Sequence, residues 1–311
     1  MKVLVTGSTG LVGTALVASL AREGHTVCRL MRPGAIEKDM ADSRGGAGGF
    51  AVSWNPATGE LGGAAVGPDA VVNLAGAPIG DGRWSPKRKE IIRSSRIDTT
   101  RALVNALAKM NVRPSVLVSA SAIGIYGNRG DEILSEESTS GSDFLAEIAR
   151  EWEVEAMKAE AIGIRVVLAR FGIILAKHAG ALQQMMTPFK FGVGGKLGSG
   201  QQWTSWVALE DVIQILRFAI ETNSVRGPIN VTSPNPVRNA EFTKILSTAM
   251  HRPAIFPAPA FALRLALGEM ADALLLSSQR VIPQKLQQLN YEFLCPDLAG
   301  TLATLLGGPS N

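Results

Sequence analysis

Apolar and polar positions alternate in two different ways along the first half of the chain. Short apolar runs predict buried strands at 2–6, 26–31, 50–54, 70–74, 116–119 and 165–171. Between them, helical spacing of apolar side chains predicts helices over 11–22, from Ser85 to about Met110, and over 142–161. Residues 33–49, rich in glycine, alanine and charge, predict a loop or a weak helix. Strands that alternate with helices form parallel βαβ units, so the predicted fold class is α/β with a doubly wound parallel sheet.

The alternation weakens after Gly172. A glycine-rich loop is predicted at 192–200, a further helix starts at Asp211, and the stretch from Asn239 onward is mostly helical and rich in leucine. No repeat and no clean linker divides the chain. We therefore predict a Rossmann-type nucleotide-binding domain over 1–172. A smaller, mostly helical substrate lobe over 173–311 is expected to be woven onto it, with a helical tail from about 239.

Composition limits the class of protein. The 311 residues are 46% hydrophobic and 19% charged, which is typical of a globular chain large enough for an α/β domain with an added lobe. A net charge of +4 is too mild to indicate nucleic acid, and we expect no such partner. The most apolar stretch, 253–276, is interrupted by prolines and charges. It predicts a buried helix and no bilayer span, and we expect no membrane partner.

Cysteine and histidine are sparse. Cys28 and Cys295 lie far apart and outside any metal-binding pattern, and His25, His178 and His251 show no metal spacing. We therefore expect no disulfide framework and no metal site. Such cysteine usage suits a reducing compartment, and no signal peptide precedes the first strand, so a cytoplasmic location is expected.

Three glycines with the spacing GxxGxxG follow the first predicted strand. The first permits a tight turn, the second lets a pyrophosphate approach the backbone, and the third lets the helix pack against the strand. The helix start then offers N–H donors and a positive dipole end. An ordinary glycine-rich turn is the alternative, but the strand before and the helix after favour a dinucleotide site. The residues expected to bind the cofactor here are Gly7, Thr9, Gly10, Leu11, Val12 and Gly13.

The end of the second strand indicates which cofactor is bound. NAD-binding domains of this type usually carry an acidic residue about 20 residues beyond the glycines, where it holds the ribose 2′-hydroxyl. Here the strand ends in Arg29-Leu30-Met31-Arg32, without a carboxylate. Because a guanidinium pairs with a 2′-phosphate, we predict NADP(H), with Arg32 on the phosphate and Met31 beside it. The alternative is that Arg32 is a solvated surface residue.

Further motifs carry a family resemblance along the whole chain. They are NLAG at 73–76, RW at 83–84, SRIDTTR at 95–101, SASAIGIYG at 119–127, ARFGI at 169–173, GVGGKLGSGQQWTSWV at 192–207 and LGEMADALLLSSQRVIPQKL at 267–286. The chain resembles the extended short-chain dehydrogenases/reductases, in the atypical group called epimerase family or SulA-like proteins, which carry a C-terminal domain of unknown role. Most basic residues of 83–101 are expected on one solvated helix face. The cofactor contacts that the resemblance implies are Asn73, Leu74, Ala75, Gly76, Arg96, Phe171 and Ile173.

Active members of that superfamily use a tyrosine and, four residues later, a lysine, and a serine steadies the substrate oxygen. This chain has two tyrosines, and neither Tyr126 nor Tyr291 is followed by lysine at that spacing. Where the resemblance places the pair, the residues are approximately Leu145 and Ala149. Tyr126 is either a substitute acid or a pocket-wall residue. The candidate catalytic residues are then Tyr126, Ser119 and Ser121.

The substrate side is expected after the sixth strand, in 188–190 and the glycine-rich loop at 192–200. Aromatic and amide side chains that follow, Trp203 and Trp206 among them, either line a pocket for a sugar or another polar ring or belong to the core.

Two functions remain open at this point. The first is an NADP(H)-binding oxidoreductase or epimerase-like protein that acts on an unidentified small molecule, a nucleotide sugar being one candidate. The second is a non-catalytic NADP(H)-binding sensor or regulator, and the resemblance to SulA-like proteins links this alternative to cell division. The absent tyrosine–lysine pair weakens the first function, while the glycine loop serves both. A monomer and a homodimer are equally compatible with the pattern.

Overall fold

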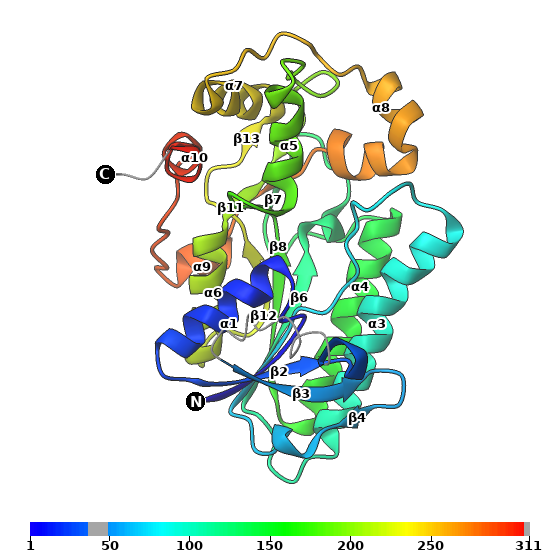
Figure 1. The fold of residues 1–311 in the computed structure, drawn as a ribbon, viewed down its shortest axis with the longest axis vertical. Coiled ribbons are helices and arrows are strands. Elements are labelled where there is room, and N and C mark those ends of the chain that lie inside the picture. The colour runs from blue at the N-terminus through cyan, green and yellow to red at the C-terminus, as the bar shows by residue number, and fades with distance from the viewer. Residues whose placement is uncertain (37–48, 308–311) are drawn as a thin grey trace.

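The structure, a computed structural model, describes residues 1–36 and 49–307, so most of the stretch at 33–49 lies outside the described residues. An eight-stranded sheet with the order β12-β8-β6-β5-β1-β2-β3-β4 forms the larger part (Figure 1). Within this sheet only β4 is antiparallel to its neighbour, which confirms the doubly wound α/β fold. The strands are β1 (Lys2–Thr6), β2 (Thr26–Met31), β3 (Gly49–Asn55), β4 (Glu60–Leu61), β5 (Ala70–Asn73), β6 (Val116–Ala122), β8 (Arg165–Phe171) and β12 (Gly227–Val231).

Helices cover both faces of this sheet, which is why its strands are nearly continuous apolar runs. On one face lie α1 (Leu11–Arg22) and α6 (Leu209–Glu221), and on the other α3 (Pro86–Ala108) and α4 (Phe144–Met157). Strand side chains alternate between the two layers: Val3 and Val5 join the core under α1 and α6, and Leu4 joins the core under α3. The strand order reverses between β1 and β5, and such a switch point opens a crevice at the carboxyl ends of the strands.

Local signals set the ends of the helices. The Ser85 hydroxyl accepts a hydrogen bond from the N–H of Arg88, so Ser85 caps α3, and Pro86 is the first helical residue. Asp143 caps α4 by accepting from the N–H of Ala146 at 2.9 Å. The helix predicted over 142–161 is shorter than expected, because a 3-10 turn over Lys158–Ile162 replaces its last part.

The boundary predicted at residue 172 does not separate the two parts of the molecule. Residues beyond it supply both α6 and β12 to the nucleotide-binding domain, where β12 pairs with β8. The chain leaves that domain through β9 (Ile173–Leu175) and returns through β11 (Trp206–Ala208), and these two strands pair with each other. Residues that the prediction assigned to the smaller lobe therefore complete the sheet and one of its helix layers.

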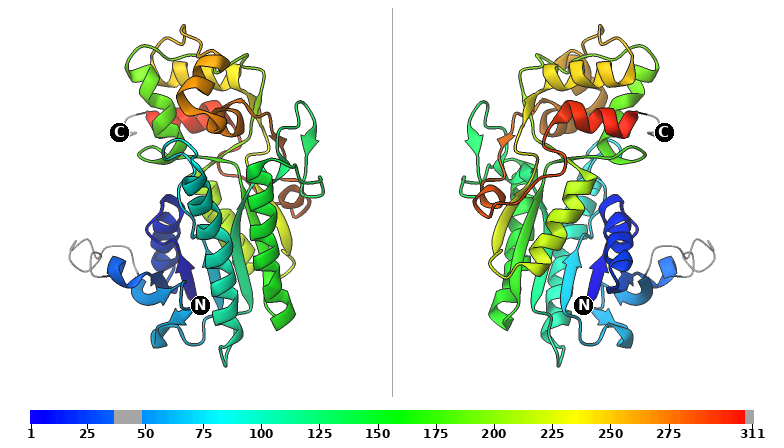
Figure 2. Two further views of the ribbon diagram at one scale, coloured as in Figure 1. Left: turned by 90° about the vertical axis from the view of Figure 1, so that its right-hand side faces the viewer. Right: turned by 90° about the vertical axis from the view of Figure 1, so that its left-hand side faces the viewer.

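The smaller lobe stands at the carboxyl edge of the sheet (Figures 1 and 2). Its core includes Leu182, Phe189, Trp206, Phe242 and Leu302. No helix in the described part of the chain is long and apolar enough to cross a membrane. The remaining elements are α5 (Gly180–Lys190), α7 (Asn239–Met250), α8 (Ala260–Leu267), a π-helical turn (Ala271–Leu276), α9 (Gln284–Gln288), α10 (Leu298–Leu306) and the strand pairs β10 (Trp203–Thr204) with β13 (Val237–Arg238) and β7 (Ile133–Leu134) with β14 (Arg280–Val281).

Candidate functional site

The glycine loop joins β1 to α1 at the crevice. Gly7 has a φ of 64°, in the left-handed region that favours glycine, and a Cβ there would lie 2.5 Å from the backbone oxygen of Leu74. A Cβ at Gly13 would lie 2.2 Å from the backbone oxygen of Gly7. At Gly10, by contrast, a Cβ would meet only that same oxygen among the described residues, at 3.3 Å. The loop thus combines a tight turn, close helix packing and one open side, as a pyrophosphate site needs.

Polar groups of this loop are left for a ligand. Gly10 is the N-cap of α1 and offers no side chain to the first N–H groups of the helix, which begins at Leu11. The Ser8 hydroxyl is buried and has no hydrogen-bond partner among the described residues. Thr9 is exposed at the rim, and Leu11 and Val12 are half-buried beside it. Free donors at a helix start and an orphaned hydroxyl fit a phosphate group.

The second wall of the crevice is the segment after β5. The Thr6 hydroxyl accepts hydrogen bonds from the N–H groups of Leu74 (3.1 Å) and Ala75 (3.2 Å) and donates to Asn73 Oδ1 (2.7 Å). Thr6 therefore fixes this segment directly against the glycine loop. Gly76 is exposed at the end of the segment, where a cofactor can reach the backbone.

Asn73 and Ser119 lie deeper than predicted. The Asn73 amide donates to Thr100 Oγ1 (2.8 Å) and to Ser119 Oγ (3.2 Å), and the indole of Trp152 donates to Thr100 Oγ1 (2.9 Å). Asn73, Thr100 and Ser119 have no exposed surface. Their polar atoms join β5, β6, α3 and α4, so Asn73 and Ser119 position the crevice and do not present a free side chain to a ligand.

A second buried network holds the other candidate catalytic residues. Arg170 forms a bidentate ion pair with Glu153 (2.8 Å for both nitrogen–oxygen contacts), and the Ser121 hydroxyl donates to the same carboxylate at 2.6 Å. The Tyr126 hydroxyl accepts from Arg170 (2.9 Å) and donates to Asn230 Oδ1 (2.7 Å). Each of these side chains is less than a tenth exposed. The network ties β6, α4, β8 and β12 together.

The Tyr126 hydroxyl is held on both sides by protein partners, an arrangement that favours the structural alternative over the substitute acid. The Tyr126 side chain has no exposed surface, and burial raises the pKa of its hydroxyl above the usual value of 10. Leu145 and Ala149 lie on the face of α4 where the resemblance places tyrosine and lysine. A Cβ at Gly124 would lie 3.4 Å from that of Leu145, so α4 lies directly against the turn that follows β6. The three candidate catalytic residues all use their hydroxyls within the protein.

Arg96 is the cation that reaches the crevice from α3. A Cβ at Gly76 would lie 3.2 Å from its guanidinium carbon, which stacks 5.3 Å from the ring centre of Trp152. Its Nη1 donates to the backbone oxygen of Ile92 at 3.0 Å, and no carboxylate among the described residues pairs with it. Burial, helped by repulsion from Arg88, lowers the pKa of Arg96 to about 10. A desolvated cation without a counterion is a strong receptor for negative charge.

Arg32 occupies the expected place at the end of β2. In the register of the sheet Leu30 lies opposite Thr6, so Arg32 stands just beyond the level where the glycine loop begins. Its side chain is exposed, and within residues 1–36 and 49–307 nothing holds it in an ion pair or hydrogen bond. Met31 is buried at the same strand end. This geometry agrees with a 2′-phosphate contact from Arg32 and with a packing role for Met31.

Apolar residues form the floor and roof of the crevice. Leu74 and Phe171 pack against a small cluster that includes Trp152. Ile173 begins β9, two residues beyond Phe171, and leads into the smaller lobe. A Cβ at Gly180 would lie 3.0 Å from Leu11, so the start of α5 lies over the glycine loop.

A pocket of about 330 Å³ opens where the smaller lobe meets α4. Asp143, Phe144 and Leu145 line it from α4, and Arg264 and Asp272 line it from the opposite side. The Arg264–Asp272 pair spans 2.9 Å and leaves both groups about half exposed. The pocket is thus polar on one side and contains Leu145, the residue at the usual tyrosine position.

The tryptophans of 203–206 do not line that pocket. Trp206 has no exposed surface and belongs to the lobe core. Trp203 is sandwiched between the guanidinium groups of Arg238 (4.5 Å) and Arg280 (4.4 Å), and its indole donates to Asp131 at 2.9 Å. Trp206 is thus a core residue as the second interpretation expected, whereas Trp203 is half-buried and packs against charged groups.

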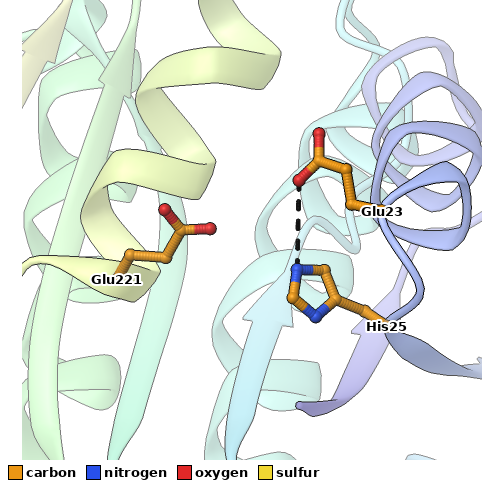
Figure 3. Close-up of side chains that lie close together, drawn as sticks. All are labelled: Glu23, His25 and Glu221. Carbon is orange, nitrogen blue, oxygen red and sulfur yellow. Dashed lines mark ion pairs between the residues drawn. The ribbon is translucent and has the colours of Figure 1, made fainter.

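One group of side chains with metal-ligand atoms occurs in the described part of the chain. Figure 3 shows Glu23, His25 and Glu221 near the amino-terminal edge of the sheet, opposite the crevice. Arg217 pairs with both glutamates, and the terminal amino group lies 3.3 Å from His25 Nδ1. The carboxylates are therefore already neutralised by cations of the chain, and the cluster carries no argument for a metal.

Sequence reasoning missed Thr6, Glu153 and Asn230. A signal existed for Glu153, because an acid on the buried face of a helix needs a cation, and Arg170 interrupts an apolar strand. Thr6 and Asn230 carried no comparable signal.

Comparison with known proteins also divides the chain into two parts. Residues 3–232 match the NAD-dependent epimerase/dehydratase family, and residues 258–305 match a domain of unknown function, DUF1731. The chain belongs to the NAD-dependent epimerase/dehydratase family. The family match ends at Thr232, the first residue after β12, in agreement with the late return of the chain to the sheet.

Relatives in this epimerase family cover nearly the whole chain. Epimerase family protein YfhF of Bacillus subtilis is 40% identical over 311 residues, covering 98% of each chain. A Mycobacterium leprae epimerase family protein is 41% identical over 292 residues, covering 94% of this chain and 91% of its own. The human epimerase family protein SDR39U1, solved with NADPH, is 30% identical with a TM-score of 0.84, covering 98% of this chain and 99% of its own. UDP-glucuronic acid 4-epimerase of Bacillus cereus, solved with NAD, shares the fold (TM-score 0.77, 16% identity, 97% and 96% covered).

Proposed function

We propose that this chain is an NADP(H)-dependent oxidoreductase or epimerase-like enzyme acting on a polar small molecule. The geometry of the crevice supports the binding of the cofactor. The glycine loop is open on one side, the start of α1 has no side-chain cap, and the Ser8 hydroxyl has no partner among the described residues. Ser8 and the N–H groups of Leu11 and Val12 would hold the pyrophosphate, and Arg32 would pair with the 2′-phosphate. The human relative solved with NADPH supports the same cofactor.

Arg96 is the residue we assign to the chemistry. When bound, NADPH would supply a hydride to a carbonyl carbon of the substrate. The carbonyl oxygen then becomes negative, and Arg96 would stabilise this charge from its place between Gly76 and Trp152. A water molecule would protonate the oxygen, because the candidate hydroxyls of Tyr126, Ser119 and Ser121 are buried and already bonded. Arg96 thereby stands in for the absent tyrosine–lysine pair.

The pocket between α4 and the 264–277 segment is the proposed substrate site. Its size suits a sugar-like ring, and the Arg264–Asp272 pair offers hydrogen bonds on one side. Nucleotide sugars are the first class to test, because solved proteins with this fold include epimerases of UDP-sugars.

The test is NADPH oxidation, followed by absorbance, across nucleotide sugars and simple carbonyl compounds. The wild type should oxidise NADPH with at least one class. Arg96→Met should lose that turnover by roughly 100-fold or more, as when an oxyanion donor is removed. Silence of the wild type across the panel, with NADPH binding intact, would favour the alternative of a non-catalytic NADP(H)-binding regulator. The buried Tyr126 and the apolar pair Leu145 and Ala149 are the observations in favour of that alternative.

A further inference from the structure

An apolar surface lies at the end of the smaller lobe farthest from the sheet. Phe191 and Leu265 are 79% and 78% exposed, and α8 has no buried residue. Backbone hydrogen bonds join the neighbouring segments, from Phe256 N–H to the Gly194 oxygen (3.1 Å) and from Ala258 N–H to the Lys196 oxygen (2.9 Å). These segments lie together at the top of Figure 1. We call this surface the apolar tip: Phe191, Val193, Ile255, Phe256, Phe261 and Leu265.

Basic residues outnumber acidic ones around the apolar tip, where the acidic groups are Glu241 on α7 and Asp272. The stretches 176–209 and 250–268 contain no aspartate or glutamate, while Lys190, Lys196 and Arg252 are exposed within them. Arg264 is also exposed and pairs with Asp272 across the substrate pocket. Exposed apolar side chains flanked by basic residues are typical of protein surfaces that insert into the interface of an anionic bilayer.

A second pocket, of about 380 Å³, adjoins the apolar tip. One face of α7 lines it with Thr243, Lys244 and Ser247, and Lys196 and Ile255 line it from the adjoining loops. No carboxylate lines this pocket, and neither lysine forms an ion pair within the described part of the chain. The Ser247 hydroxyl donates to the backbone oxygen of Arg252 at 2.7 Å, which leaves two ammonium groups and the Thr243 hydroxyl for a ligand. These groups, around a cavity beside exposed apolar side chains, match a phosphate headgroup attached to acyl chains.

We propose that the apolar tip docks on an anionic phospholipid surface, with a lipid phosphate in the pocket between Lys196 and Lys244. A second copy of the chain fits less well, because a symmetric contact would bring the same unpaired lysines face to face. Attachment to one leaflet needs no spanning helix, and it leaves the nucleotide crevice, at the other end of the lobe, open to solvent.

The experiment is co-sedimentation with vesicles of phosphatidylcholine alone and with vesicles of equal parts phosphatidylcholine and phosphatidylglycerol. The wild type should sediment with the second and not with the first. Phe191→Ser and Phe261→Ser should each weaken binding roughly tenfold, since each ring leaves an apolar environment. Lys196→Gln and Lys244→Gln should each weaken it roughly fivefold, the effect of one basic residue near such a surface.

The matched control is Val112→Ser, which removes an exposed apolar side chain (61%) between α3 and β6, far from the tip. It should sediment like the wild type, and all variants should bind NADPH like the wild type, which shows that they fold. Equal binding to both kinds of vesicle, or equal loss in Val112→Ser, would overturn the proposal. So would a dimer in solution that Phe261→Ser dissociates, or a protein partner retained through the tip in the absence of lipid.

Discussion

The guanidinium of Arg96 stacks on the indole of Trp152, 5.3 Å from its ring centre, although the two residues belong to different helices. Trp152 follows Ala149 by three positions on α4, so both lie on one face of that helix. Arg96 in α3 thus brings a positive charge to the neighbourhood where family members carry a lysine on α4. The charge is similar, but it comes from another element and has no carboxylate partner among the described residues.

Removing this charge should stabilise the free protein and weaken the cofactor complex. Arg96→Met keeps much of the side-chain volume and removes a desolvated cation, so the free energy of unfolding should rise by roughly 1–3 kcal/mol. NADPH affinity should fall about tenfold to a hundredfold, the usual loss for a charged hydrogen bond. Chemical denaturation and calorimetric titration measure the two effects. Arg96→Lys serves as control and should recover part of the affinity; a less stable Arg96→Met with unchanged affinity contradicts this role.

The same residue predicts a pH dependence. Burial lowers its pKa from the usual range of arginine to about 10, so in the folded protein the charge of Arg96 is lost as the pH rises through about 10, while in the unfolded chain it persists up to that usual range. The destabilisation caused by the buried charge is therefore complete at neutral pH and is relieved between those values. NADPH affinity should fall over the same range. Other groups titrate in this range too. The measurement is therefore the difference in the free energy of unfolding between wild type and Arg96→Met at each pH, and a difference that stays constant with pH would refute the assignment.

Gly13 offers the sharpest test of the loop. A Cβ at this position would lie 2.2 Å from the Gly7 oxygen, so Gly13→Ala must push α1 away from the phosphate cradle. We expect NADPH affinity to fall by at least roughly tenfold, together with a lower melting temperature. Gly63→Ala is the control, since a Cβ there meets no atom of the described residues within 4 Å. Similar behaviour of both variants in fluorescence titration with NADPH would mean that the close packing has no role in binding.

The buried pair of Arg170 and Glu153 should dominate the stability of this region. Glu153→Gln leaves the guanidinium of Arg170 without its charge partner, and loss of one member of such a pair costs about 3–5 kcal/mol. Arg93→Met breaks the partly exposed pair with Glu151 and should cost about 0–1 kcal/mol. Urea denaturation of both variants gives the comparison. Equal losses in the free energy of unfolding would show that burial does not increase the contribution of the Arg170–Glu153 pair to stability.

The sequence predicted the parts of the fold that depend on local pattern. Apolar runs located β1, β2, β3, β5, β6 and β8, and the glycine loop was placed correctly between β1 and α1. β12 was missed because its sequence, Gly-Pro-Ile-Asn-Val over 227–231, contains no continuous apolar run. Helix 142–161 was predicted too long because its last turn changes to 3-10 geometry without a proline or glycine until Gly163.

The residues of the site could be predicted only where the conformation of the backbone requires a particular residue type. Gly7 and Gly13 are required by close contacts within the protein, Gly10 leaves one side of the loop open, and the motif encodes all three. For Tyr126, by contrast, the motif gives the position of the residue and not the partner of its hydroxyl. Asn230, which accepts from it, lies 104 positions away. The distinction between a free phenol and a buried one therefore required the tertiary structure.

The central claim, that Arg32 and the glycine loop form an NADP(H) site, is tested most directly by calorimetric titration with NADPH and NADH. The wild type should bind NADPH more tightly than NADH, and Arg32→Ala should lose roughly tenfold to a hundredfold in affinity for NADPH alone, because only NADPH has a 2′-phosphate to pair with the guanidinium. Equal affinities of the wild type for both cofactors, or an Arg32→Ala variant that keeps its preference for NADPH, would contradict the account.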